Sequence, residues 1–168
     1  TIPTDQDDVR ELRDTAPDAD LWVRDRASPS APERNVTERI TGTTDRYDIK
    51  DVNVSPDGKK FVFAMRGPLA MNQDEEDPPT WGIWEYNIET DALRRLISSS
   101  TIAAEGHDVA PAYLPDGRII FSSTRQRQSQ AILRDEGKPG YEAQTDSRNE
   151  SAFVLHVMKA DGTDLRQI

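Results

Sequence analysis

One turn motif, Pro-Asp-Gly, occurs twice between apolar stretches and constrains the fold more than any other feature. The copies lie in D-V-N-V-S-P-D-G-K-K-F-V-F-A-M, residues 51–65, and V-A-P-A-Y-L-P-D-G-R-I-I-F-S-S-T, residues 109–124. Proline fixes φ at such a turn, aspartate can bond the neighbouring backbone, and glycine adopts the positive φ that closes it. Each copy therefore predicts a β-hairpin.

The two hairpins differ by one residue after the glycine. A gap at that point matches Phe61 with Ile119 and Phe63 with Phe121. The gap is physically required, because a slip of one residue would turn every apolar side chain of the strand to the opposite face. We therefore expect Phe63 and Phe121 to occupy equivalent buried positions.

The stretch that follows each hairpin also repeats. G-I-W-E-Y-N-I-E-T-D-A-L-R-R-L-I at 82–97 aligns with F-V-L-H-V-M-K-A-D-G-T-D-L-R-Q-I at 153–168, so that Leu96 matches Ile168. Four short strands in each repeat are typical of a propeller blade. The sequence predicts an all-β chain, a partial β-propeller of two four-stranded blades and an N-terminal half blade. Its innermost strands are expected at 51–55 and 110–114, leading outward into 60–65 and 118–123.

The predicted chain has four parts. They are an acidic arm at 1–19, a half blade at 20–43, blade one at 44–98 with an insertion at 66–80, and blade two at 99–168 with an insertion at 125–150. The arm and both insertions have few apolar anchors, so we expect them to be mobile or to be ordered by a partner.

The half blade is predicted from an alternating strand around Trp22 and from the pair Arg39-Ile40, which we align with Arg95-Leu96. Such a half blade can complete the last blade of a closed propeller and remove an exposed sheet edge. The alternative is a strand-like stretch in a linker. If it closes a ring, Leu21, Val23 and Ile40 should contact apolar side chains from outside these residues, as parts of a larger closed propeller.

Composition limits the possible functions. The chain has 168 residues, of which 35% are hydrophobic, and that content is low for a domain that buries its own core. A net charge of −10 argues against nucleic acid as a partner. The absence of cysteine excludes cysteine-ligated metals and C-x-x-C-H haem attachment in these residues. No apolar run is long enough for a membrane span.

Two groups of residues are weak candidates for a metal site. The acidic run from Asp74 to Asp77 offers carboxylates of the kind that calcium prefers, but a solvated charge run is the favoured interpretation. His107 and Asp108 form the second candidate, for metal binding or acid–base chemistry. Capping of a turn by Asp108 is the favoured interpretation there. His156 alternates with apolar residues on a strand and is expected to be a packed or edge histidine rather than a ligand.

Four arginines of the second insertion stand out in an acidic chain, and they could contact an acidic partner or a cofactor carboxylate: Arg125, Arg127, Arg134 and Arg148. A solvated surface excursion is the alternative. We find no catalytic motif such as G-x-S-x-G, H-E-x-x-H or a Walker loop. No cofactor is therefore expected in this chain.

The S-P-D-G-K-K hairpin and the A-D-G-T-D-L-R turn resemble the repeats of the periplasmic TolB family and of the noncatalytic propellers of prolyl-oligopeptidase-like enzymes. The form H-D-V-A-P-A-Y-L-P-D-G-R-I-I-F-S-S with its long insertion is similar to the middle domain of the hydrazine synthase alpha subunit. The resemblance covers residues 44–168. It implies an exported protein, periplasmic or secreted.

Two functional hypotheses follow from the resemblance. The first is a scaffold or protein-binding module, whose partners are another protein chain or the remaining blades of the same protein. The second is the propeller domain of a larger multihaem redox enzyme, with haem carried outside these residues. In that family the haem motifs lie outside the propeller, so the resemblance assigns no catalytic residue to this chain.

Overall fold

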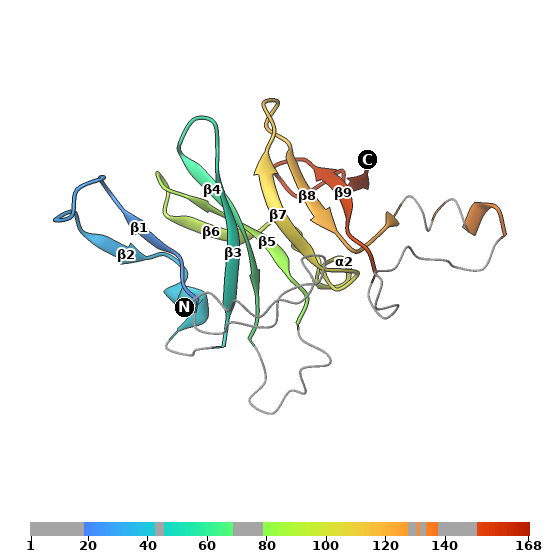
Figure 1. The fold of residues 1–168 in the computed structure, drawn as a ribbon, viewed down its shortest axis with the longest axis horizontal. Helices are drawn as coiled ribbons and strands as arrows, with labels where there is room; N and C mark the ends of the chain where they lie inside the picture. Colours follow the sequence, from blue (N-terminus) through green and yellow to red (C-terminus); the bar gives the residue numbers. More distant parts are fainter. Residues whose placement is uncertain (1–18, 43–45, 69–78, 128–130, 132–133, 138–150) are drawn as a thin grey trace.

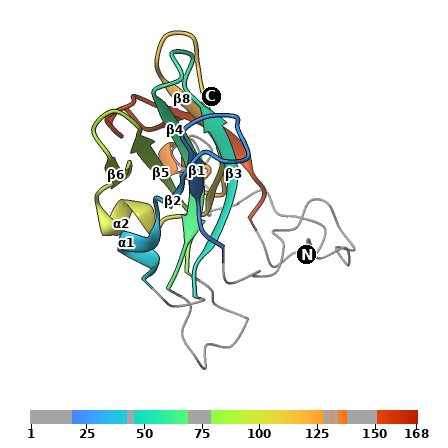
Figure 2. The same cartoon turned by 90° about the vertical axis from the view of Figure 1, so that its left-hand side faces the viewer.

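Three antiparallel sheets stand side by side in the order in which they occur along the chain (Figure 1). The structure, a computed structural model, describes residues 19–42, 46–68, 79–127, 131, 134–137 and 151–168. Seen from the side of the first sheet, the half blade lies in front of the two blades (Figure 2).

The strand bounds are as follows. The half blade contains β1 (Trp22–Arg24) and β2 (Glu33–Asn35); blade one contains β3 (Asp48–Val54), β4 (Lys60–Arg66), β5 (Gly82–Asn87) and β6 (Ala92–Arg95); blade two contains β7 (Asp108–Tyr113), β8 (Ile119–Ser123), β9 (Val154–Met158) and β10 (Arg166–Gln167). Short helices, α1 (Glu38–Thr41) and α2 (Ser100–Ala103), follow β2 and β6. None of the helices in the described segments combines the length and apolar character of a membrane-crossing helix.

Each blade is a simple meander. The strand order is β3-β4-β5-β6 in blade one and β7-β8-β9-β10 in blade two, and β3 lies next to β7. Sheets of four strands that stack through their faces, with first strands adjacent, are the architecture of a propeller. The predicted all-β, partial β-propeller with two blades and a half blade is therefore confirmed.

The Pro-Asp-Gly turns form as their residues require. Gly58 and Gly117 have φ values of 70° and 83°, and their N–H groups donate to the carbonyls of Ser55 and Leu114 at 2.9 Å. Asp57 accepts a hydrogen bond from the N–H of Lys59 at 3.1 Å, and Asp116 accepts an equivalent bond from Arg118. Both predicted hairpins are confirmed.

The innermost strands begin earlier than the sequence indicates. They cover Asp48–Val54 and Asp108–Tyr113 rather than 51–55 and 110–114. Each contains a register shift at a residue with positive φ, Asp51 at 58° or Ala110 at 51°. A bulge breaks the two-residue period, and alternation therefore could not reveal the first half of either strand.

Strand register confirms the alignment of the two hairpins. Val54 pairs with Phe61 and Tyr113 pairs with Ile119, so Phe61 and Ile119 are equivalent. Phe63 and Phe121 follow two residues later in their strands, with exposures of 0% and 1%. Each lies on the face of its blade that points toward the preceding sheet.

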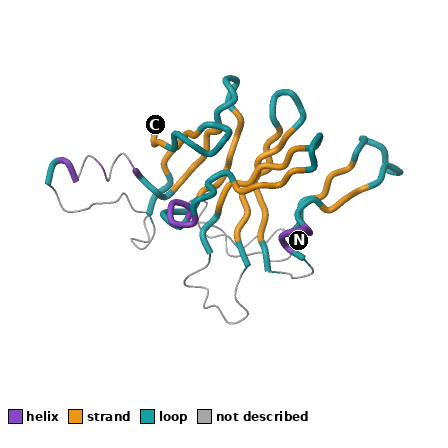
Figure 3. The backbone as a smooth tube through the Cα atoms, turned by 180° about the vertical axis from the view of Figure 1, so that it is seen from behind, coloured by secondary structure: helices purple, strands orange, loops and turns teal. Residues whose placement is uncertain are grey.

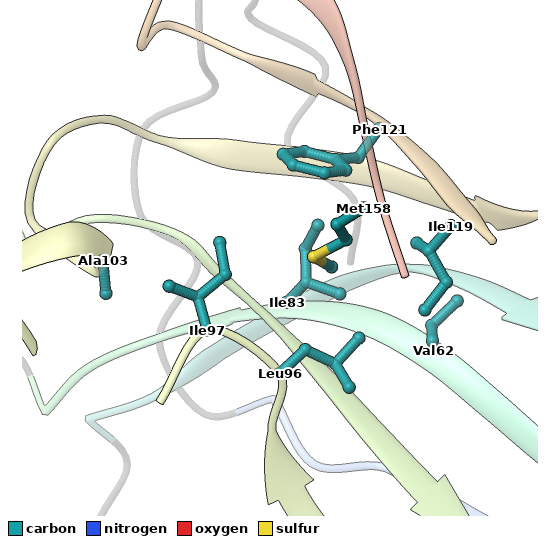
Figure 4. Close-up of a cluster of buried hydrophobic side chains, with 8 residues drawn as sticks. All are labelled: Val62, Ile83, Leu96, Ile97, Ala103, Ile119, Phe121 and Met158. Atoms are coloured by element: carbon teal, nitrogen blue, oxygen red, sulfur yellow. The ribbon is translucent and has the colours of Figure 1, made fainter. Parts of the chain in front are cut away.

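Apolar clusters fill the spaces between consecutive sheets. We call the face toward the next sheet in the chain the trailing face, and the face toward the preceding sheet the leading face. The trailing face of blade one meets the leading face of blade two in a cluster of Val62, Ile83, Leu96, Ile97, Ala103, Ile119, Phe121 and Met158 (Figure 4). Alternate residues of β4 lie in different clusters. Val62 belongs to the cluster between the two blades, whereas Phe63 belongs to the cluster that faces the half blade.

The half blade forms, but its alignment needs correction. The N–H groups of Val36, Leu96 and Ile168 donate to the carbonyls of Leu21, Ile83 and Leu155 at 2.9–3.0 Å. Val36, and not Ile40, is thus the counterpart of Leu96. Ile40 lies in α1, and a helix of four residues is too short to show a period in the sequence. Both helices lie at the same end of the sheets (Figures 1 and 3).

The expected contacts of the half blade also need correction. Leu21, Val23 and Ile40 pack against the cluster of blade one that contains Phe61 and Phe63, so their contacts come from within the chain. The acidic arm up to residue 18, most of both insertions, the run from Asp74 to Asp77 and Arg148 lie outside the described residues.

We expect Phe121→Ala and Phe63→Ala each to lower the free energy of unfolding by about 3–5 kcal/mol, because each removes a fully buried aromatic ring. Val54→Ala is the control, since Val54 is 56% exposed on β3 and should change stability by less than about 0.5 kcal/mol. Chemical denaturation of the full protein measures the three values. An unchanged midpoint for Phe121→Ala would contradict the equivalence of the blades.

Candidate functional site

Three residues from two separate predicted groups, His107, Asp108 and Arg125, lie together between blade one and blade two, beside Trp81. Trp81 precedes β5, His107 and Asp108 stand at the start of β7, and Arg125 follows β8. The N–H of Asp108 donates to the carbonyl of Trp81 at 3.0 Å, which joins the two blades. We call this region, which also contains Ser123, the seam.

A buried ion pair forms the polar part of the seam. The Arg125 guanidinium donates from Nε to Asp108 Oδ1 at 3.0 Å and from Nη2 to Oδ2. Ser123 donates its hydroxyl to Asp108 at 2.7 Å, and Arg125 Nη1 donates to the Ile102 carbonyl of α2. Asp108 and Arg125 are only 1% and 2% exposed. Charges so deeply buried require this pairing.

Burial raises the pKa of Asp108, and the hydrogen bonds from Arg125 and Ser123 oppose that effect. The sequence predicts that Asp108 caps a turn. That prediction is wrong, because its carboxylate is bonded by the Arg125 guanidinium. The expected partner-facing role is also wrong for Arg125, which is buried on Asp108. Arg127 bonds Glu105 at 2.7 Å, and Arg134 is exposed.

His107 joins the two blades through its ring. Its Nδ1 accepts a hydrogen bond from the backbone N–H of Trp81 at 3.3 Å. Burial, followed by the positive charges of Arg66 and Lys50, lowers the pKa of His107 to about 4. Those two cations lie against the Trp81 ring, at 4.6 and 4.4 Å from its centre. His107 is therefore neutral at pH 7.

The seam does not have the geometry of a metal or catalytic centre. His107 and Asp108 bind different groups, and the described part of the chain contains no cluster of three metal-ligating side chains. Ser123 is 0% exposed, and its oxygen accepts from the N–H of Arg125 while its proton goes to Asp108. A hydroxyl engaged in this way has no access to a substrate.

Extension of the repeat alignment would have pointed to Asp108 and Ser123, although not to their partner Arg125. Strand register makes Asp108 the counterpart of Ile49 and Ser123 the counterpart of Met65. Blade two therefore has polar residues where blade one has apolar ones. The bulges lie at the equivalent residues Asp51 and Ala110, so they leave this correspondence intact.

His156 is packed in β9, as predicted. It is fully buried, its ring stacks on Phe121 with centroids 5.8 Å apart, and its Nδ1 lies 3.1 Å from the Val154 carbonyl. Burial lowers the pKa of His156. Among the described residues its Nε2 has no hydrogen-bond partner, and its burial and the stacking on Phe121 show that the ring is packed.

The two ends of the sheet stack expose apolar side chains. Leu155 and Ile168, on the trailing face of blade two, are 50% and 60% exposed, whereas their counterparts Ile83 and Leu96 are buried. At the other end Trp22 of β1 is 58% exposed, and its counterpart Trp84 packs between blade one and the half blade. We call these two surfaces the open faces.

Asp108→Asn should lower the free energy of unfolding by about 3–5 kcal/mol, because it removes the carboxylate that Nε and Nη2 of the buried Arg125 bond and leaves only the more exposed Glu105, 3.5 Å from Nη1. Arg127→Gln, which breaks the more exposed pair with Glu105, should cost less than about 1 kcal/mol. Denaturation of both variants of the full protein gives the comparison. Equal losses in the two variants would show that the buried pair has no special structural role.

Comparisons with known proteins give structural resemblance alone. No family model and no curated protein matches the chain. An Agrobacterium tumefaciens protein assigned to TolB aligns over 81% of this chain and 33% of its own, with 20% identity and a TM-score of 0.45. Two structures of the isopeptidase AtxE2 each align over 70% of this chain and 17% of their own, with a TM-score of 0.39. The identity is 14% for the apo form and 15% for the S527A variant with Astexin3-dC4 bound. The chain thus spans about a third of the length of the first match.

Proposed function

We propose that this chain is a non-catalytic β-propeller scaffold, part of a larger ring, that presents protein-binding surfaces in an exported bacterial protein. One observation carries the proposal. The open faces expose Trp22, Leu155 and Ile168 at positions whose counterparts pack against a neighbouring sheet. Exposed apolar patches on a regular surface are typical of contact sites for other protein.

The partner that fits an open face is another propeller sheet. The trailing face of blade one shows the required complement, because Ile83 and Leu96 there are covered by Phe121 and Met158 of blade two. Further blades of the same protein or another polypeptide would supply such a surface. The net charge of −10 favours protein over nucleic acid as that partner.

The absence of a catalytic role is supported by the seam. Its buried polar side chains, Asp108, Ser123 and Arg125, bond one another within blade two. The backbone of Trp81 bonds His107 and Asp108 and so joins blade one to blade two. A scaffold needs such rigidity and no substrate pocket. Location in the periplasm is supported by the resemblance of residues 44–168 to exported propellers.

A second candidate is the propeller domain of a larger multihaem enzyme. It rests on the sequence resemblance of H-D-V-A-P-A-Y-L-P-D-G-R-I-I-F-S-S and the insertion after it to the hydrazine synthase alpha subunit. The chain would be a scaffold there too, because it has no cysteine for haem attachment. A haem-stained gel and an intact mass of the protein from its native source separate the two candidates.

Hydroxyl-radical footprinting of the full protein tests the scaffold. We expect Trp22, Leu155 and Ile168 to be protected from oxidation, because neighbouring sheets would cover them. Val54, which is 56% exposed on the innermost strand of blade one, is the internal control and should remain reactive. Oxidation of Leu155 and Ile168 at the rate of Val54 would contradict the proposal.

A further inference from the structure

His107 takes part in one of the groups of polar bonds that join blade one to blade two. The backbone of Trp81 makes two of them with consecutive residues of blade two: its N–H donates to His107 Nδ1 at 3.3 Å, and its carbonyl accepts from the N–H of Asp108 at 3.0 Å. The first of these bonds requires an unprotonated Nδ1, because a ring nitrogen that carries a proton cannot accept.

The charges around His107 make protonation unfavourable. Lys50 of β3 and Arg66 of β4 both act on the ring as positive charges. The carboxylate of Asp48 lies 3.7 Å from Arg66, and that of Asp108 is held by Arg125 and Ser123. A proton on His107 would therefore add a third positive charge beside two others and would break the bond to Trp81.

We propose that His107 is an acid-sensitive latch that keeps the seam between blade one and blade two closed at neutral pH and releases it on acidification. Release exposes the small apolar cluster of Ala64, Trp81 and Val109, which fills the seam beside the latch. The latch is independent of which partner covers the open faces, and it adds a pH response to the scaffold.

The direction of the response follows from proton linkage. Burial and the two cations lower the pKa of His107 from 6.5 to about 4 in the closed seam, and a released, solvated ring returns to the higher value. The open form therefore binds the proton more tightly. The equilibrium shifts toward it as pH falls below 6.5, by about tenfold for each pH unit, and the shift ends near pH 4.

Hydrogen exchange of the full protein tests the latch. The protection factor of the Trp81 amide, corrected for intrinsic exchange, should fall by about tenfold between pH 6 and pH 5. The amide of Ile88 is the internal reference, because it bonds the Lys59 carbonyl at the other end of blade one. His107→Gln is the matched variant, since its side-chain carbonyl can accept from Trp81 and does not titrate. Its Trp81 protection should not change with pH beyond that of Ile88.

Two results would overturn the proposal. One is equal loss of Trp81 protection in the wild type and in His107→Gln, which would assign the pH response to another group. The other is the titration midpoint of His107 itself, measured by NMR on the wild-type protein. This measurement does not depend on whether a variant folds. A midpoint near 6.5 would show that the closed seam does not resist protonation, whereas a midpoint near 4 supports the latch.

Discussion

Face-to-face packing of consecutive sheets is the interaction on which this structure depends. Alternate residues of a strand point to opposite faces, and the blades have apolar residues on both. In β4, Val62 faces blade two, whereas Phe61 and Phe63 face the half blade. A blade with two apolar faces cannot bury either by itself, so its stability comes from its neighbours. The exposed Leu155 and Ile168 at the end of the stack follow from the same constraint.

Polar contacts between the blades set the distance at which the apolar faces meet. Asp51 and Asn53 of β3 accept hydrogen bonds from the N–H groups of Ala110 and Tyr113 at 3.0 and 3.1 Å. Near the outer edge Gly162, with φ of 84°, approaches blade one so closely that a Cβ would lie 2.0 Å from the Leu96 carbonyl oxygen. A larger residue there would force the sheets apart. The glycine of this turn is therefore required by packing as well as by backbone conformation.

The features that the sequence predicted correctly are those set by residues close together in the chain. The Pro-Asp-Gly turns, the match of Phe63 with Phe121 and the packed His156 follow from turn residues and strand period, which act over a few residues. Contacts over longer separations could not be predicted in this way. The ion pair joins Asp108 at the start of β7 to Arg125 beyond the end of β8, where neither the turn residues nor the strand period predict a partner.

The leading faces of the two blades differ in polarity. Blade one has the apolar Ile49 and Met65 at positions where blade two has the polar Asp108 and Ser123. Blade one has Ile49 and Met65 against an apolar half blade, where any apolar surface of suitable shape would fit. Blade two has Asp108 and Arg125 in the corresponding region, and Arg125 needs the Ile102 carbonyl of α2 as an acceptor. Nη1 of Arg125 also lies 3.5 Å from Glu105 Oε2, so acceptors from the segment before β7 serve this buried charge. The apolar clusters therefore join consecutive sheets, whereas the ion pair satisfies the buried charges of blade two from within residues 99–168.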